Sequence, residues 1–240
     1  MVKNAIIEIN KRINRACLAC GRDPSAIRLV AVSKTAGIAQ IEEALACGIT
    51  DLGESRVQDA VSKFNAIRTT QYACLAGRQA GRASWQMIGH LQTNKVKEAV
   101  QIFDLIHSVD SLRLAEEIDR QAARINKVQD ILIEVKTSAE ATKFGFPPEE
   151  AVLAAQEISK VKNLRLLGLM TIAPFVDDPQ QARPYFRRLR ELLDQINAER
   201  ISPNAVRELS MGMTNDFEAA IAEGATIVRI GRAIFESGRE

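Results

Sequence analysis

The sequence has few of the residues that build disulfide frameworks or metal centres. Four cysteines and two histidines occur in 240 residues, which is too few for a disulfide scaffold in a chain of this length and fits a reducing compartment. Cys17 and Cys20 form a CxxC pair, but it lies late in the first predicted helix and no second pair follows. We therefore interpret the cysteines as small buried thiols and expect no metal or redox site.

A charge excess of one sign is also missing. The 32 basic and 30 acidic residues leave a net charge of +2, and they alternate along the predicted helices without a basic stripe, so the pattern does not call for nucleic acid. Residues 1–4 lead into an amphipathic helix rather than a signal peptide, and no apolar stretch is long enough to span a bilayer. We expect a cytoplasmic monomer with no membrane or nucleic-acid partner.

The sequence contains instead a regular alternation of short apolar runs and amphipathic segments, which is typical of parallel βα units. Eight strands are predicted, over Arg28–Ser33, Asp51–Glu54, Trp85–Gly89, Leu105–Val109, Ile131–Lys136, Leu164–Met170, Arg207–Met211 and Thr226–Ile230. Helices are predicted over Ile38–Cys47, Leu112–Ile125, Pro148–Val161, Ala182–Ile196 and Phe217–Ala222, with an additional N-terminal helix over Ile6–Cys17. Residues 69–84 form the longest uncertain loop, which we interpret as a surface insertion.

Eight parallel strands with crossovers close most naturally into a TIM barrel, the (β/α)8 fold of the α/β class. With 46% apolar residues, the 240-residue chain can bury one large core, so residues 1–240 are expected to form a single domain. The extra N-terminal helix would cap the barrel or pack beside it. Active sites of such barrels lie at the C-terminal ends of the strands, which directs attention to the residues there.

Lys34 is the most informative of these residues, because it follows the apolar run of residues 29–33. An ammonium held against an apolar core is costly unless it is paired or neutral, and a neutral lysine is a nucleophile for aldehydes. Lys34 is therefore a Schiff-base candidate, and the solvated end of a strand is the alternative interpretation.

The loops after the seventh and eighth strands have the composition of a phosphate site. Ser210-Met211-Gly212-Met213-Thr214 and Ile230-Gly231-Arg232-Ala233 offer hydroxyls, glycine amides and an arginine that could converge on one phosphate. Ordinary turn chemistry would explain either loop alone. A lysine nucleophile opposite a phosphate site describes a pocket for a phosphorylated aldehyde, of which pyridoxal 5′-phosphate (PLP) is the obvious candidate.

Arg229 lies on the strand between these loops. Alternation places Ile227 and Arg229 on one face and Val228 and Ile230 on the other. Arg229 could then point toward the pocket near the pyridine nitrogen, where its charge would disfavour protonation of that nitrogen. A lumen arginine paired with a carboxylate such as Glu54 is the alternative.

Six motifs along the chain carry a family resemblance. They are Ala31-Val32-Ser33-Lys34, Gly53-Glu54-Ser55-Arg56-Val57-Gln58, Ile88-Gly89-His90-Leu91-Gln92-Thr93-Asn94-Lys95, Gly168-Leu169-Met170, Leu209-Ser210-Met211-Gly212-Met213 and Val228-Arg229-Ile230-Gly231-Arg232-Ala233-Ile234-Phe235. Through them the chain resembles the pyridoxal phosphate homeostasis family over nearly its whole length. It departs from the family pattern at Ser55, where asparagine is usual, at Gln86-Met87, which replace His-Phe, and at Arg232, which often corresponds to threonine.

The resemblance implies a barrel similar to the N-terminal domain of alanine racemase, with PLP in Schiff-base linkage to Lys34. It also implies phosphate contacts from Ser210 and the Gly231-Arg232 backbone, with Arg229 near the pyridine nitrogen. The predicted cofactor-binding residues are Lys34, Ser55, Met170, Ser210, Gly212, Arg229, Gly231 and Arg232. No catalytic or metal-binding residue is predicted.

The implied function is reversible PLP binding in vitamin B6 homeostasis and amino-acid balance, without catalytic turnover. A PLP racemase needs two acid/base groups, and alanine racemases take the second, a tyrosine, from an additional β domain, whereas this sequence ends soon after the eighth strand. Tyr72, Tyr185 and His90 are poor replacements. The alternatives are a small PLP-dependent amino-acid racemase or lyase, and a class I aldolase-like barrel that uses Lys34 on a sugar phosphate.

Protein partners are the least constrained part of the prediction. PLP-dependent apoenzymes or a regulatory protein are candidates to exchange the cofactor. Four arginines lie on or near one face of the predicted helix Ala182–Ile196, namely Arg183, Arg187, Arg188 and Arg190. They could bind such a partner or form a solvated charged face, and we favour the solvated face.

Overall fold

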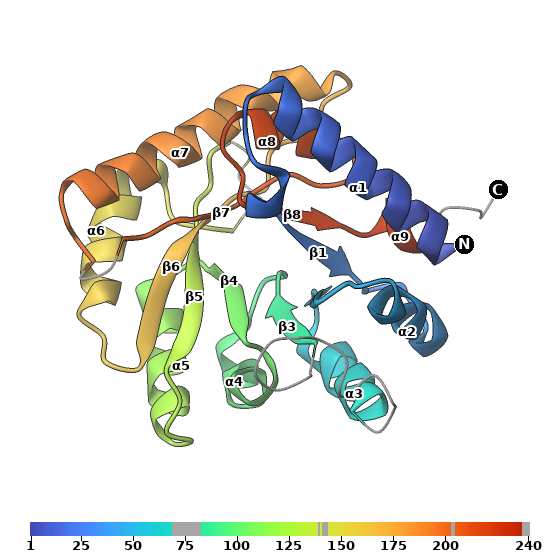
Figure 1. Ribbon diagram of the computed structural model, residues 1–240. Helices are drawn as coiled ribbons and strands as arrows, with labels where there is room; N and C mark the ends of the chain where they lie inside the picture. The colour runs from blue at the N-terminus through green and yellow to red at the C-terminus, as the bar shows by residue number, and fades with distance from the viewer. Residues whose placement is uncertain (69–82, 139, 141–143, 203–204, 237–240) are drawn as a thin grey trace.

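The computed structural model describes residues 1–68, 83–138, 140, 144–202 and 205–236. Within these residues, parallel strands close into one barrel in the order β1-β2-β3-β4-β5-β6-β7-β8 (Figure 1). The strands are β1 (Arg28–Val32), β2 (Asp51–Glu54), β3 (Ser84–Met87), β4 (Leu105–Val109), β5 (Gln129–Glu134), β6 (Leu164–Met170), β7 (Glu208–Ser210) and β8 (Ile227–Ile230). The barrel closes where Ala31 of β1 pairs with Ile230 of β8, which confirms the predicted TIM barrel.

The helices follow the strands around the outside of the barrel (Figure 1). They are α2 (Ile38–Ala46), α3 (Val57–Ile67), α4 (Val96–Ile102), α5 (Leu112–Ala123), α6 (Pro148–Ser159), α7 (Arg183–Ala198), α8 (Phe217–Ala222) and α9 (Arg232–Phe235). Each covers its neighbouring strands with small and branched apolar side chains, such as Ala151, Ala155 and Ile158 of α6.

The predicted N-terminal helix is present as α1 (Val2–Ala19) and packs beside the barrel against α2, α8 and α9 (Figure 1). Its buried face contains Ile6, Ile9 and Ile13, which recur at the three- and four-residue spacing of one helix face. Arg12 adds an ion pair of 2.7 Å with Glu218 and lies 4.6 Å above the ring of Phe217. The helix therefore attaches the start of the chain to its last βα units.

Several predicted strand boundaries are wrong by one or two residues. The chain leaves β5 after Glu134 rather than after Lys136, because Val135 forms an isolated bridge with Phe146 outside the barrel sheet. The first strand ends at Val32 rather than at Ser33, whose hydroxyl donates to Glu54. The predicted loop of residues 69–84 lies almost wholly outside the described residues, as do Cys74 and Tyr72.

The barrel lumen has its own small apolar core. Its members come from five strands and include no helical residue: Val30, Leu105, Leu132, Met170 and Ile227. Only the inside of a closed sheet can bring these side chains together. Val228 and Ile230 belong instead to the outer core between sheet and helices, so the predicted alternation along β8 is confirmed.

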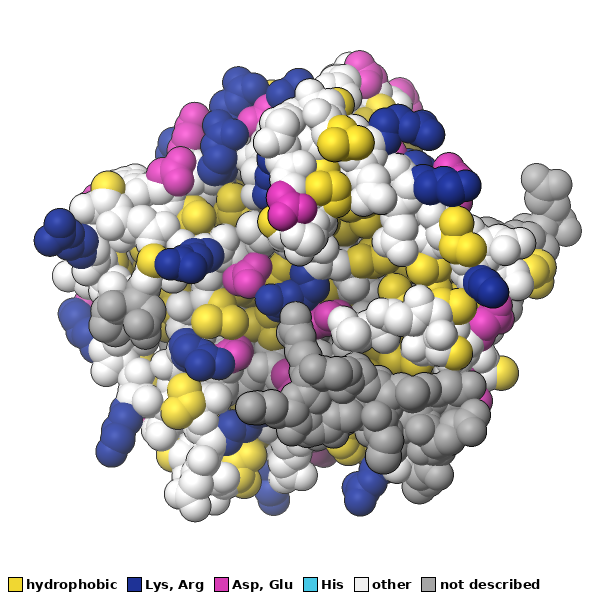
Figure 2. All heavy atoms as spheres, viewed as in Figure 1, with side chains coloured by type: hydrophobic (Ala, Val, Ile, Leu, Met, Phe, Trp, Pro, Cys, Tyr) yellow, Lys and Arg dark blue, Asp and Glu magenta, His cyan; other side chains and the backbone are white. Residues whose placement is uncertain are grey.

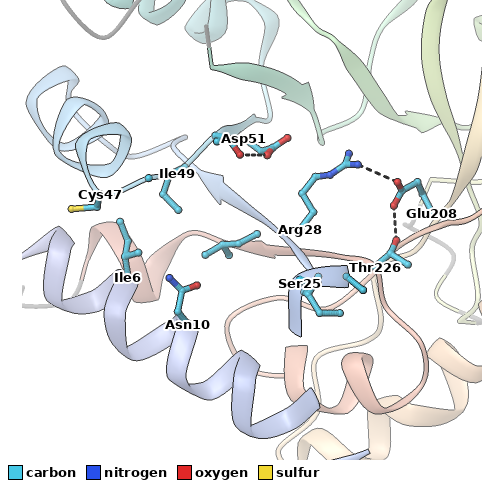
Figure 3. Close-up of a pocket in the computed structure, with 14 residues that line it drawn as sticks. Ile6, Asn10, Ser25, Arg28, Cys47, Ile49, Asp51, Glu208 and Thr226 are labelled. Carbon is cyan, nitrogen blue, oxygen red and sulfur yellow. Dashed lines mark hydrogen bonds and ion pairs between the residues drawn. The ribbon is translucent and has the colours of Figure 1, made fainter. Parts of the chain in front are cut away.

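A cavity of about 330 Å³ lies at the end of the barrel where the strands begin (Figure 3). Arg28 points toward Glu208 across it, with 3.1 Å between the guanidinium and Oε1, and Thr226 donates to the second oxygen of Glu208 at 2.6 Å. None of the predicted cofactor-binding residues lines this cavity. It is therefore distinct from the predicted site at the opposite end.

The surface carries both signs of charge. Over the described part of the face seen in Figure 2, basic and acidic side chains are interspersed. On α7, Arg183, Arg187 and Arg190 all contact the buried carboxylate of Glu223, at the end of α8. These three arginines therefore fasten α7 to α8, which corrects the interpretation of a simply solvated face.

The two cysteines of the CxxC pair differ in burial. Cys17 is buried and burial raises the pKa of its thiol, but Cys20 is exposed, which corrects the expectation that both are buried. Across the described helices, none combines the length and the apolar character that crossing a bilayer requires.

Candidate functional site

Lys34 stands directly beyond β1, at the end of the barrel where the strands finish. Its side chain is exposed, so the expectation that its ammonium is held against the apolar core is wrong. Within the described residues it makes no hydrogen bond or ion pair that would compete with a ligand. Lys34 is therefore a candidate reactive amine because of its position in the barrel and not because of burial.

The backbone beside Lys34 is clamped by a buried ion pair. Glu54, at the end of β2, is fully buried and accepts from Ser33 Oγ at 2.6 Å and from Lys63 Nζ of α3 at 2.8 Å. Lys63 Nζ also donates to the carbonyl oxygen of Ser33 at 2.5 Å. Glu54 is thus occupied by Ser33 and Lys63, so the alternative pairing of Arg229 with Glu54 is wrong.

The segment that follows Lys34 is fastened to α9. Thr35 Oγ1 donates to Glu236 Oε1 at 2.9 Å, and Gln40 Nε2 donates to the carbonyl oxygen of Phe235 at 3.0 Å. Gly231, directly before α9, approaches β1 so closely that a Cβ there would lie 3.1 Å from the carbonyl oxygen of Val32. The structure thus brings the Lys34 segment and the predicted phosphate loop around Gly231 together.

Arg229 and Ser210 lie inside the lumen at the ends of β8 and β7. The Arg229 guanidinium is 4% exposed; it donates to Ser210 Oγ at 2.6 Å and to the carbonyl oxygen of Thr171 at 2.8 Å. Burial lowers the pKa of Arg229 to about 10, and the negative charges of Glu134 and Asp216 oppose this decrease. Even at this pKa, the guanidinium stays charged at neutral pH and needs its acceptors.

Two carboxyl groups near Arg229 are also perturbed. Burial raises the pKa of Glu134 to about 7, with a further contribution from the charge of Asp110, and Arg229 opposes this rise. Burial also raises the pKa of Asp216, while the N–H of Met213, which it accepts at 2.6 Å, lowers it. Glu134 therefore titrates near neutral pH beside a fixed cation.

The remaining predicted residues lie around this end of the barrel. Gly212 has φ +92°, and a Cβ there would meet Ala220 and the backbone of Phe217, so glycine is required by the turn itself. Met170 is fully buried in the lumen core, Ser55 is half-buried, and Arg232 is exposed at the start of α9. Of these, only Met170 lies beneath the end of the barrel as an apolar wall.

His90 lies exposed at the same end of the barrel. Its Nδ1 is 2.9 Å from Asp110 Oδ2, and its ring stacks on Phe144 with 3.7 Å between the centroids. The described residues contain no group of three side chains suited to hold a metal ion.

Sequence reasoning missed the polar side chains of the lumen. His107 is fully buried between Gln86 and Ser210, and Glu134 ends an apolar run of β5. The signal was present, because a histidine or glutamate on the inward face of a buried strand needs a polar partner.

A closed (β/α)8 barrel with a lysine after its first strand and glycine loops after its last two belongs to the alanine racemase type of barrel. Residues 11–237 match the family described as alanine racemase, N-terminal domain. A pyridoxal phosphate homeostasis protein of Aquifex aeolicus is 43% identical over 225 residues, covering 94% of this chain and 93% of that protein. This chain belongs to the pyridoxal phosphate homeostasis family.

Two further relatives agree with this assignment. A pyridoxal phosphate homeostasis protein of Synechocystis is 40% identical over 212 residues, 88% of this chain and 92% of that protein. The solved structure of PipY of Synechococcus elongatus with PLP bound has a TM-score of 0.83 and 30% identity, and the match covers 98% of this chain and all of that one.

Proposed function

We propose that this protein binds PLP at the C-terminal end of its barrel and acts in the homeostasis of that cofactor. The observation that carries the proposal is the position of Lys34, whose unpaired amine lies on a segment that two hydrogen bonds fasten to α9. Membership of a family named for PLP homeostasis and the PLP-bound structure of PipY support it.

The donor groups at this end fit the chemistry of PLP. The cofactor supplies an aldehyde that condenses with a primary amine and a phosphate that needs hydrogen-bond donors. Lys34 offers the amine, and the first turn of α9, at Gly231 and Arg232, leaves backbone N–H groups without partners inside the helix. Met170, Ser55 and Gly212 are the further residues that we propose to contact the cofactor.

The charge of Arg229 affects whether bound PLP could take part in catalysis. Arg229 is a fixed cation inside the lumen, and near a pyridine nitrogen it would disfavour protonation and weaken the ring as an electron sink. We therefore assign the protein a role in holding and exchanging PLP without turnover. PLP-dependent apoenzymes are the partners such exchange would serve.

The test is absorbance after incubation with PLP, followed by borohydride reduction and peptide mapping. We expect a yellow protein and a phosphopyridoxyl group on Lys34. Lys34→Ala should abolish both, and the exposed Lys162→Ala should change neither. A protein that stays colourless and unmodified, or one that is modified at Lys136 instead, would sink the assignment of Lys34.

A second candidate function, an amino-acid racemase or lyase, is favoured by one observation. The pKa of Glu134 at about 7 suits a general acid or base. Exchange of the α-proton of a bound amino acid with solvent deuterium, lost in Glu134→Gln, would establish it. Absence of exchange for every amino acid supplied would leave the binding protein as the function.

A further inference from the structure

Five buried polar side chains form a single line across the barrel lumen, from Asp51 of β2 to Arg229 of β8. Asp51 Oδ1 lies 2.5 Å from Gln86 Nε2, and Gln86 Oε1 lies 2.7 Å from His107 Nε2. His107 Nδ1 lies 2.8 Å from Ser210 Oγ, which lies 2.6 Å from an Arg229 nitrogen. All five are less than 5% exposed.

The line has only one consistent direction of hydrogen bonding. The amide of Gln86 must present its NH₂ to the Asp51 carboxylate, because two oxygens facing each other would repel, and this leaves Oε1 facing His107. His107 Nε2 is therefore the donor. Burial and the charges of Arg229 and Arg28 hold the pKa of His107 well below its usual range, so the ring carries this one proton.

The second ring nitrogen then determines the state of Ser210. Without a proton, His107 Nδ1 can only accept, so the hydroxyl of Ser210 donates to it. A hydroxyl has one proton, and here that proton is committed to the ring. The oxygen of Ser210 is left as an acceptor, and Arg229 donates to it. Every donor thus points from the cation at one end toward the carboxylate at the other, an arrangement in which successive bonds polarise one another.

We infer that Gln86 and His107 are positioning residues, which make Ser210 an acceptor for Arg229 and leave it no proton to donate to a phosphate. This inference rests on the proposed function and refines the predicted contact of Ser210. Ser210 then contributes to the site by holding the guanidinium, together with the carbonyl oxygen of Thr171. A phosphate contact from the backbone around Gly231, as proposed above, does not depend on Ser210.

The first test uses the protein without ligand. In ¹⁵N-histidine spectra, with His90→Gln used to assign the two rings, we expect the His107 ring to carry its proton on Nε2 from pH 6 to 8. Gln86→Leu removes the acceptor that selects this form and should yield a mixture of the two neutral forms. A wild-type ring protonated on Nδ1, or on both nitrogens, overturns the inference.

The second test distinguishes whether Ser210 affects ligand affinity through Arg229 or through a contact with the phosphate. PLP and pyridoxal, which lacks the phosphate, are titrated into wild type and Ser210→Ala. We expect Ser210→Ala to weaken both ligands by a similar factor, roughly tenfold for a lost hydrogen bond to a charged group. The same substitution in an Arg229→Gln background should have little further effect. A loss confined to PLP, or one that persists without Arg229, overturns the inference.

Gln129→Leu is the matched control for Gln86→Leu. Gln129 is also a fully buried amide, and it donates to the carbonyl oxygens of Asp104 and Asp130, away from the line. We expect Gln129→Leu to lower stability without changing affinity for either ligand, whereas Gln86→Leu should weaken both ligands as Ser210→Ala does. Equal effects of Gln129→Leu and Gln86→Leu on affinity overturn the inference.

If wild type binds neither ligand, the proposed function fails and the role of Ser210 fails with it. If wild type binds the ligands but Ser210→Ala does not weaken both by a similar factor, this inference fails and the proposed function stands.

Discussion

At the scale of single residues, Gly168 is the described glycine at which an added Cβ would lie nearest to another atom. It pairs with Glu208 across β6 and β7, and a Cβ at this position would lie 1.9 Å from the carbonyl oxygen of Glu208. No rotamer change can relieve a contact with backbone, so the two strands would have to separate. The motif Gly168-Leu169-Met170 therefore begins with glycine for a packing reason.

Gly168→Ala should lower the free energy of unfolding by about 3 kcal/mol or more, because the strand pair must shift. Urea denaturation followed by circular dichroism measures this. Gly37→Ala is the matched control, since a Cβ there meets nothing within 4 Å, and it should cost about 1 kcal/mol or less. Equal losses of unfolding free energy in the two variants would show that the close approach to Glu208 is not what requires glycine at position 168.

Single residues also show which parts of the candidate site can be predicted from the sequence and which cannot. Lys34, Gly231 and Arg229 were predicted because strand ends and alternation are local patterns. The partners of His107 were not, because Gln86 and Ser210 come from strands separated from it by 21 and 103 residues. Only the barrel register decides which inward-facing residues meet, and register follows from bulges and turns that composition does not specify.

At the scale of elements, α3 holds the ends of β1 and β2 together. Lys63 of α3 contacts the carboxylate of Glu54 and the carbonyl oxygen of Ser33. One oxygen of Glu54, Oε2, is buried without a partner in the described structure, so the charge of Glu54 depends on Lys63. The clamp is not predicted from the sequence, because no helix is predicted over Val57–Ile67 and Lys63 stands in no motif.

Lys63→Met should lower the free energy of unfolding by about 3 to 5 kcal/mol, because it leaves Glu54 as an unpaired buried charge. Glu54→Gln combined with Lys63→Met should recover part of this loss, since no buried charge then remains. Chemical denaturation of four proteins, namely wild type, Lys63→Met, Glu54→Gln and the double variant, measures both effects. If the double variant is as unstable as the sum of the single ones, Lys63 and Glu54 do not act as a pair.

At the scale of the whole molecule, the barrel encloses charges as well as apolar groups. Asp51, Glu134 and Arg229 are all buried inside the closed sheet. Alternation of apolar runs was sufficient to predict the closed fold, since eight βα units have few other arrangements. It could not predict that polar side chains would stand beside apolar ones inside the lumen, as Ser210 does beside Met170 and Arg229 beside Val30.

The buried carboxyl of Glu134 should make the stability of the whole molecule depend on pH near neutrality. Its pKa is about 7 in the folded protein and about 4.3 in an unfolded chain, so the folded state binds the extra proton between these values. Stability from this group is complete below about pH 4 and falls as pH rises through 7, by about 4 kcal/mol in all. Above about pH 8 its contribution is constant.

Glu134→Gln keeps the shape of the neutral carboxyl and removes its titration. Unfolding free energies of wild type and variant, measured from pH 4.5 to 8.5, should therefore differ increasingly in favour of the variant as pH rises. Subtracting the two curves removes the opposite contribution of His107, whose lowered pKa costs stability as pH falls. Glu116→Gln, at an exposed position of α5, should run parallel to wild type throughout. A Glu134→Gln curve that also runs parallel to wild type would mean that Glu134 is ionised in the folded barrel across this range, with Arg229 outweighing its burial.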